Sequence, residues 1–144
     1  TALDTCGLVD STMLVEAASL ADVVLFDLKA MDSDVHREWT GAPNPRILSN
    51  LMLLHSLNAN VWIRLPLIPG VNDDEPNIES TIACLLKTRF RRVSILPYHR
   101  IADAKYRRLG LVNRLEGVEP PQAARIEEIR TRFADAGFDP HVGS

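Results

Sequence analysis

The stretch DVVLFDL, residues Asp22–Leu28, decides the fold because it is an almost unbroken run of β-branched and apolar residues. Two similar runs follow, NVWIRLPL at Asn60–Leu67 and RVSILP at Arg92–Pro97. Such runs are typical of strands in a parallel sheet whose two faces are both covered. Because helical patterns separate them, the sequence predicts an α/β fold of parallel β-α-β units. The predicted sheet has three clear strands and a short, truncated fourth strand that ends at Leu3-Asp4.

Helical patterns fill the segments between these strands. The expected helices run from Ser11 to Leu20, from Asn44-Pro45 to Leu57, from Asp73 to about Lys87, and from Pro120-Pro121 to Ala136. Each begins at a Ser, Asn, Asp or Pro, which are residues that favour helix starts. The polar stretch from Arg100 to Val118 is longer than the loops that usually connect two elements of a compact domain. We therefore expect residues 100–120 to form an irregular loop that faces a partner.

Composition limits the possible functions of this 144-residue chain, which we expect to form a single domain. The net charge is −3 and the two signs are interspersed, so no electrostatic footprint for nucleic acid is present. The apolar stretches are far shorter than the roughly 18 residues that a membrane helix needs. Cys6 and Cys84 match no disulfide or metal-site spacing. These features predict a cytoplasmic protein that binds neither nucleic acid nor membrane.

Charged residues lie in or just after the three strands at regular intervals. Lys29, Arg64 and His99 are 35 residues apart (64 − 29 and 99 − 64), about the length of one β-α unit. Asp27 lies two residues before Lys29 and therefore on the same side of the strand. With Asp4, these residues are expected to meet at the carboxyl rim of a partial barrel, where barrel enzymes place their chemistry. Carboxylates beside Lys and Arg suit a small zwitterion such as an amino-acid moiety.

Seven short motifs carry a resemblance to a known family. In order and spacing, they are similar to the C-terminal half of radical S-adenosylmethionine (SAM) enzymes that activate glycyl radical enzymes, of the pyruvate formate-lyase activating type. The motifs are TALDTCG (1–7), LFDLK (25–29), WTG (39–41), WIRLPLIPGVND (62–73), LPYHR (96–100), KY (105–106) and LEGVEPP (115–121). Each motif alone is weak, but the ordered set is specific and covers essentially the whole chain.

The resemblance implies a fold and an activity. Such enzymes use a partial (β/α)6 barrel that holds a [4Fe-4S] cluster and SAM. Reductive cleavage of SAM gives a 5'-deoxyadenosyl radical, which takes a hydrogen atom from a glycine of the partner enzyme. A flavodoxin- or ferredoxin-type protein is the implied reductant. At about 35 residues per unit, six units need roughly 210 residues, so we expect this chain to be half of a radical SAM barrel.

The resemblance also implies which residues hold SAM. Asp27 and Lys29 look like the pair that contacts the methionine part, with Lys29 on its carboxylate. Arg64 resembles the strand arginine near the same moiety. His99 resembles the residue that reaches the ribose or adenine.

A second implied site is a monovalent-cation site beside SAM. Asp4, Thr5, Asp27 and the carbonyl of Leu25 match the positions that surround such a cation in the family. These assignments come from the resemblance alone. They place the expected cation next to the expected SAM carboxylate.

The sequence also departs from the family pattern. It contains no Cys-x3-Cys-x2-Cys motif for the cluster and no Gly-Gly-Glu segment for the SAM amino group, and Cys6 and Cys84 cannot replace the missing cysteines. We therefore predict that this chain alone binds no cluster, binds SAM weakly or not at all, and is inactive. Its first strand would have an unpaired edge, which favours an edge-mediated dimer.

Two other interpretations stay open. The chain is a non-catalytic module that keeps only a partner-binding surface, or it is an unrelated barrel enzyme. In the latter case Lys29 forms a Schiff base, or Asp4, Asp27 and His99 hold a divalent metal. Pull-down without SAM turnover would favour the first alternative. Borohydride trapping or metal analysis would favour the second.

Overall fold

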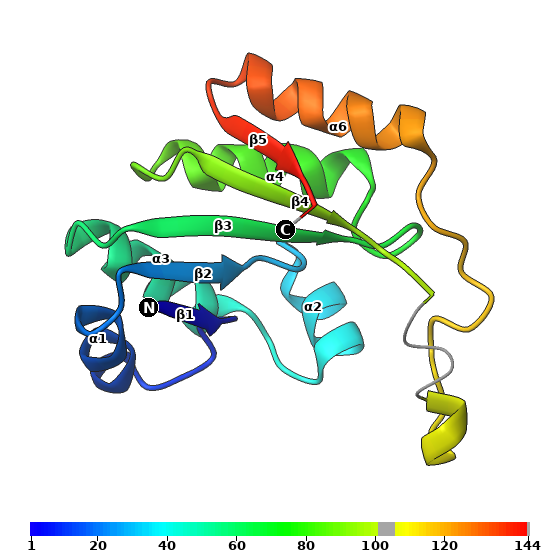
Figure 1. Ribbon diagram of the computed structural model, residues 1–144, viewed down its shortest axis with the longest axis horizontal. Helices are drawn as coiled ribbons and strands as arrows, with labels where there is room; N and C mark the ends of the chain where they lie inside the picture. Colours follow the sequence, from blue (N-terminus) through cyan, green and yellow to red (C-terminus); the bar gives the residue numbers. More distant parts are fainter. Residues whose placement is uncertain (101–105, 144) are drawn as a thin grey trace.

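Five parallel strands form one sheet in the order β1-β2-β3-β4-β5. The computed structural model describes residues 1–100 and 106–143. The strands lie side by side and point the same way, so their carboxyl ends form one rim (Figure 1). Their bounds are β1 Ala2–Thr5, β2 Val23–Asp27, β3 Val61–Leu67, β4 Arg92–Pro97 and β5 Asp139–Val142. The predicted α/β class with a parallel sheet is confirmed.

Helices connect successive strands. Their bounds are α1 Ser11–Ser19, α2 Ser33–Thr40, α3 Pro45–Ser56, α4 Glu75–Leu86 and α6 Ala123–Asp135, with one further helical turn at residues 106–109. Local chemistry sets several of these ends. The side chain of Asp32 accepts hydrogen bonds from the first turn of α2, and Gly41, at φ +85°, ends that helix. Prolines occupy the first turns of α3 and α4, where no intrahelical N–H donor is needed.

Helices cover one face of the sheet and build the core there. Alternate strand residues such as Phe26, Ile63 and Ile95 are completely buried and pack against apolar side chains of α1, α3, α4 and α6. Leu54 of α3 and Phe133 of α6 are equally inaccessible. The opposite set of strand residues is only half-buried, as the alternating burial of β3 shows. Only one face is therefore closed by helices.

The structure corrects three details of the predicted fold. It has five strands rather than three and a clipped fourth, because β5 (DPHV) is too short and polar to be recognised as a strand. Its Pro140 is tolerated because β5 is an edge strand. Helix α2 was not expected, since its sequence SDVHREWT has few apolar residues. The sheet faces are not both covered, because charged residues such as Arg64 belong to the open face.

The long loop lies beside the carboxyl rim (Figure 1). Its first part, including Lys105, lies outside the described residues. Arg100, at the start of the loop, forms an ion pair with Glu119 near its end and donates a hydrogen bond to the carbonyl of Val118 over 3.3 Å. These contacts bring the two ends of the loop together. Within the described ranges, no helix has the length and apolar character needed to cross a membrane.

Candidate functional site at the carboxyl rim

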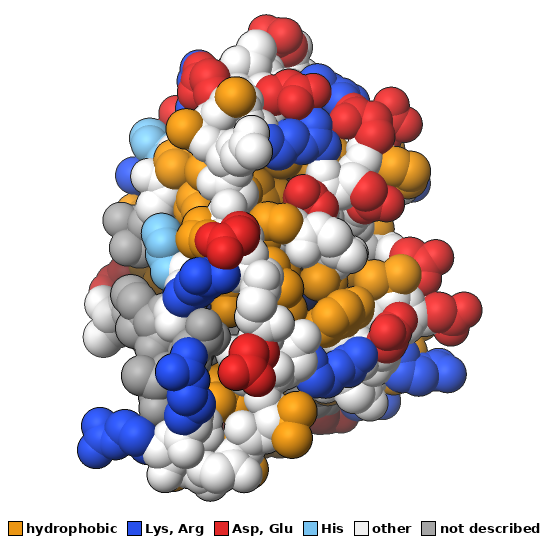
Figure 2. Space-filling model, turned by 90° about the vertical axis from the view of Figure 1, so that its right-hand side faces the viewer, with side chains coloured by type: hydrophobic (Ala, Val, Ile, Leu, Met, Phe, Trp, Pro, Cys, Tyr) orange, Lys and Arg blue, Asp and Glu red, His pale blue; other side chains and the backbone are white. Residues whose placement is uncertain are grey.

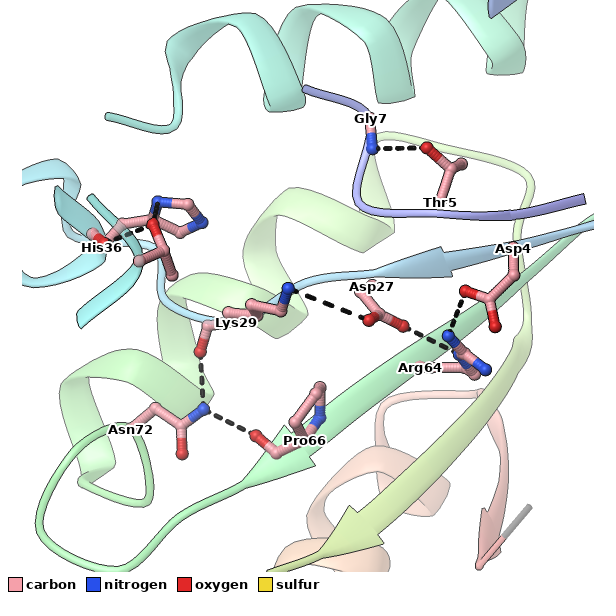
Figure 3. A network of polar contacts seen from close by, with 10 residues as sticks. Asp4, Thr5, Gly7, Asp27, Lys29, His36, Arg64, Pro66 and Asn72 are labelled. Atoms are coloured by element: carbon pink, nitrogen blue, oxygen red, sulfur yellow. Dashed lines mark hydrogen bonds and ion pairs between the residues drawn. The ribbon is translucent and has the colours of Figure 1, made fainter. Parts of the chain in front are cut away.

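Arg64 joins two carboxylates on the open face of the sheet. Asp27 and Arg64 are register partners on the adjacent parallel strands β2 and β3, and Asp4 lies on the same face of β1. Arg64 Nε donates to Asp27 Oδ1 over 2.7 Å, and Arg64 Nη2 forms an ion pair with Asp4. Figure 3 shows the guanidinium between the two acidic side chains. Parallel pairing therefore unites three residues that are far apart in sequence.

Burial and charge act on Arg64 in opposite directions. Its side chain is 20% exposed, and that of Asp27 is 17% exposed. Burial by itself would lower the pKa of Arg64, but hydrogen bonds and charge from Asp27 and then Asp4 outweigh burial and raise the pKa. Arg64 thus stays a cation with both carboxylates as counter-ions.

Lys29 is the more available cation of this rim. Its Nζ lies 4.0 Å from Asp27 Oδ2, and its side chain is 37% exposed. The Asp27 carboxylate is closer to Arg64 than to Lys29, so its ion pair with Lys29 is the weaker of its two ion pairs. An ammonium group with a distant partner and access to solvent can donate hydrogen bonds to the carboxylate of a ligand. The rim therefore has the charges that a zwitterionic ligand requires.

The remaining predicted residues are placed differently. His99 is exposed and follows β4, and no hydrogen bond or ion pair within residues 1–100 and 106–143 joins it to Asp27, Lys29 or Arg64. The residue of β4 that is in register with Arg64 is Ser94. Thr5 Oγ1 accepts a hydrogen bond from the backbone N–H of Gly7 over 3.0 Å. The structure thus brings Asp4, Asp27, Lys29 and Arg64 into one network, with His99 outside it.

Buried asparagines around the rim were missed by the sequence analysis. Asn44, Asn50 and Asn72 are each at most 5% exposed, and all three donate to backbone carbonyls of the connecting loops. Asn50 holds the β1–α1 loop through the carbonyls of Gly7 and Val9, at 2.8 and 2.9 Å. In the sequence each is an isolated Asn in a loop or a helix, and the residue type by itself does not show what the amide binds.

A cavity of about 490 Å³ opens beside Lys29. Its walls come from α2, the β3–α4 loop and the long loop, and they include Trp39, Ile68 and Val112. Arg114 lies over the Trp39 ring at 4.4 Å and donates to the carbonyl of Glu38, so the long loop is fastened to α2. Figure 2 views the molecule from the side of this rim and shows hydrophobic side chains across its middle. The site is therefore a charged network next to an apolar cavity.

The residues present do not fit a [4Fe-4S] cluster. Three thiolates are needed in the family pattern, and the sequence has only Cys6 and Cys84, both free thiols. Burial raises the pKa of the Cys84 thiol, and the charge of Lys87 only partly offsets this. In the described part of the chain, no group of three or more His, Cys, Asp or Glu residues has the geometry of a metal site.

The fold defines the class, an open parallel α/β sheet with charged groups at its carboxyl rim, and comparisons with known proteins show which family the chain resembles. The chain is 38% identical, over 99% of its length, to the trans-4-hydroxy-L-proline dehydratase activating enzyme of Clostridioides difficile. It is 37% identical, also over 99%, to the pyruvate formate-lyase 2-activating enzyme of Escherichia coli K12. These matches cover 48% and 49% of the two relatives. No family model matches the sequence.

A solved structure supports the same assignment. The crystal structure of a domain of pyruvate-formate lyase-activating enzyme from Bacteroides vulgatus ATCC 8482 matches 99% of this chain and 80% of that one, with a TM-score of 0.82 and 28% identity. Along nearly its whole length, the chain is therefore similar to glycyl-radical-enzyme activating enzymes, including those of the pyruvate formate-lyase type. It spans about half the length of the curated relatives that it matches.

Proposed function

We propose that this chain is part of a radical SAM activating enzyme that generates a glycyl radical on a partner enzyme, and that it corresponds to the C-terminal half. The observation that carries the proposal is the identity of 37–38% to activating enzymes over nearly the whole chain. The charged network of Asp27, Lys29 and Arg64 supports it, because it suits the amino-acid end of SAM.

In this proposal Lys29 binds the SAM carboxylate and Asp27 contacts the methionine moiety. Arg64 orients the Asp27 carboxylate by its 2.7 Å hydrogen bond, so that Asp27 can accept a hydrogen bond from a ligand amino group. His99 reaches the ribose or adenine from beyond the end of β4. Its exposed side chain leaves it free to turn toward a ligand at the rim.

The monovalent-cation site belongs to the same proposal. A cation at Asp4, Thr5, Asp27 and the Leu25 carbonyl would take the place that the Arg64 guanidinium holds between the two carboxylates. Cation binding and the Arg64 bridge would therefore exclude one another. Potassium titration of the intact gene product, followed by SAM affinity, tests whether the cation or Arg64 neutralises this pair.

Residues outside these 144 would bind the cluster, and a flavodoxin- or ferredoxin-type protein would reduce it. With such a cluster held elsewhere in the enzyme, SAM would supply the radical chemistry that acts on the partner's glycine. The contribution of this chain is to bind and orient SAM. The 144 residues alone are expected to be inactive, and we place the enzyme in the cytoplasm.

Residues 100–120 would face the glycyl radical enzyme. Large apolar side chains are exposed there, with Leu109 at 60% and Val112 at 86%. Arg107 and Arg108 are also exposed, and no described carboxylate pairs with them. Apolar side chains beside exposed arginines suit a partner surface that is apolar in its centre and acidic at its border.

The free edge of β1 gives a second proposed contact. β1 is the first strand of the sheet, so the backbone groups on its outer side have no strand partner in the described chain. If the 144 residues are expressed alone, two copies are expected to associate through these edges. Sedimentation over a range of concentrations tests this association, and a concentration-independent monomer would contradict it.

Two measurements test the main proposal. SAM affinity of the intact gene product is compared with that of Lys29→Met and of the control Lys87→Met, whose lysine is exposed at the end of α4. Only Lys29→Met should weaken binding, by about tenfold or more, because a charge-assisted contact is lost.

A glycyl radical signal on a partner enzyme should then require SAM and reductant. SAM cleavage by the 144 residues alone would overturn the prediction of inactivity, and partner binding without SAM turnover by the intact gene product would favour a non-catalytic module.

A further inference from the structure

The loop that carries Lys29 is held by asparagine side chains from other parts of the chain. Residues 29–31 leave the sheet after β2 and lead into α2, so their backbone groups lack a strand partner. Asn44, Asn72 and Asn77 supply hydrogen bonds to these groups, and we call them the asparagine cluster. They come from the start of α3, the β3–α4 loop and α4.

Asn72 holds the carbonyl of Lys29 itself. Its side-chain nitrogen donates to Lys29 O and to Pro66 O, both over 2.6 Å, as Figure 3 shows. Its side-chain oxygen accepts from the N–H of Ile68 over 2.8 Å. Both donors and an acceptor position of the amide are used, and the residue is only 5% exposed.

The other two members hold the next residues of the loop. Asn44 donates to the carbonyls of Ala30 and Met31 over 3.0 and 2.9 Å. Asn77 accepts from the N–H of Met31 over 2.8 Å and donates to the carbonyl of Asn72 over 2.8 Å. Every backbone carbonyl from residue 29 to residue 31 therefore has a side-chain amide as its partner.

We propose that the asparagine cluster positions Lys29 for recognition of the ligand carboxylate. This inference rests on the proposed role of Lys29 in SAM binding. A lysine side chain has a long flexible stem, so a fixed backbone limits the region that its ammonium can reach and lowers the ordering cost of binding. Asn44, Asn72 and Asn77 are positioning residues in this scheme, because they act through Lys29.

The chemistry of the loop explains why amides occupy these positions. The loop presents carbonyl oxygens, which require N–H donors. A buried carboxylate at residue 72 would donate nothing. Its negative charge, close to Lys29, would also compete with the ligand carboxylate. An amide satisfies the carbonyls and leaves the Lys29 charge available.

Two ligands that differ by one carboxylate test the proposal. SAM and decarboxylated SAM are titrated into the intact gene product and into its Asn72→Ala and Asn44→Ala variants. We expect each variant to lose about five- to tenfold in affinity for SAM, with the affinity for decarboxylated SAM changed less than twofold. The second variant keeps the test decisive if Asn72→Ala does not fold.

Asn50→Ala is the matched control, because Asn50 is equally buried and also donates to two loop carbonyls, but in the β1–α1 loop. It should leave the preference for SAM unchanged. An equal loss for both ligands, or the same change in Asn50→Ala, would show a purely structural role and overturn the inference. If Lys29→Met does not alter the preference either, the proposed role of Lys29 fails as well, so the two failures are distinguishable.

Discussion

Arg64 and Asp27 are 37 residues apart in sequence, yet they are direct register partners on neighbouring strands, joined by a hydrogen bond of 2.7 Å. The bond orders an acidic side chain at the rim where the ligand is proposed to bind. It also leaves Lys29 as the cation with the more distant partner.

The Arg64–Asp27 pair should stabilise the fold measurably. A double-mutant cycle with Arg64→Met and Asp27→Asn is expected to give a coupling energy of about 1–2 kcal/mol in urea unfolding, because both side chains are mostly buried. The pair Arg130 and Glu127 on the surface of α6 is the control and should show no measurable coupling. A coupling indistinguishable from the control would mean that the pair adds nothing to stability.

Gly7 should be intolerant of any side chain. An added Cβ would lie 2.3 Å from Cζ of the buried Phe26 ring, and the backbone has φ +73°. Gly7→Ala should therefore cost about 1–3 kcal/mol from the clash in addition to about 1–2 kcal/mol from the left-handed backbone. Gly137→Ala, at φ +92° with nothing within 4 Å of the Cβ, should show the backbone cost alone. Equal losses in urea unfolding would rule out the clash.

The thiol of Cys84 should be slow to alkylate. Burial raises its pKa, so at a given pH a smaller fraction is thiolate than for a free cysteine. The alkylation rate by iodoacetamide, followed by peptide mass spectrometry, should rise with pH over a higher range than in the urea-unfolded chain. If the pH profiles of folded and unfolded chains coincide, the environment of Cys84 has no effect on its reactivity.

The arginines of the long loop should matter for partner binding. Arg107→Glu together with Arg108→Glu is expected to weaken association of the intact gene product with a glycyl radical enzyme at least tenfold at low salt, by reversing two exposed charges. The control is Arg46→Glu, since Arg46 is exposed on α3. Surface plasmon resonance at two salt concentrations measures both. An effect of equal size in the control would indicate a general dependence on net charge.

Much of the architecture could be predicted from the sequence because the strands carry strong local signals. The runs around Val23–Asp27, Val61–Leu67 and Arg92–Pro97 were located to within a residue or two. The elements that were missed, α2 and β5, are short and polar. Their conformation depends on caps and on pairing with a neighbour, and neither is visible in a local pattern.

The candidate site was predicted only in part. Regular spacing placed Lys29 and Arg64 at one rim, and the structure joins both to Asp27. The same spacing predicted nothing about hydrogen-bond partners, such as the contact between the Asn72 amide and the carbonyl of Lys29. His99 follows β4 at the expected position. Because it lies beyond the end of the strand, the alternation of strand side chains does not determine which face of the sheet its side chain takes.

The sequence by itself determined the fold class and the family resemblance, because apolar periodicity and ordered motifs are properties of the chain read residue by residue. Tertiary structure alone decided which charges neutralise one another and which amides hold the Lys29 loop. These contacts join residues such as Asp4 and Arg64, which lie 60 positions apart. Parallel pairing and burial create such neighbours only when the strands assemble. Local sequence therefore specifies the strands, and their register specifies the site.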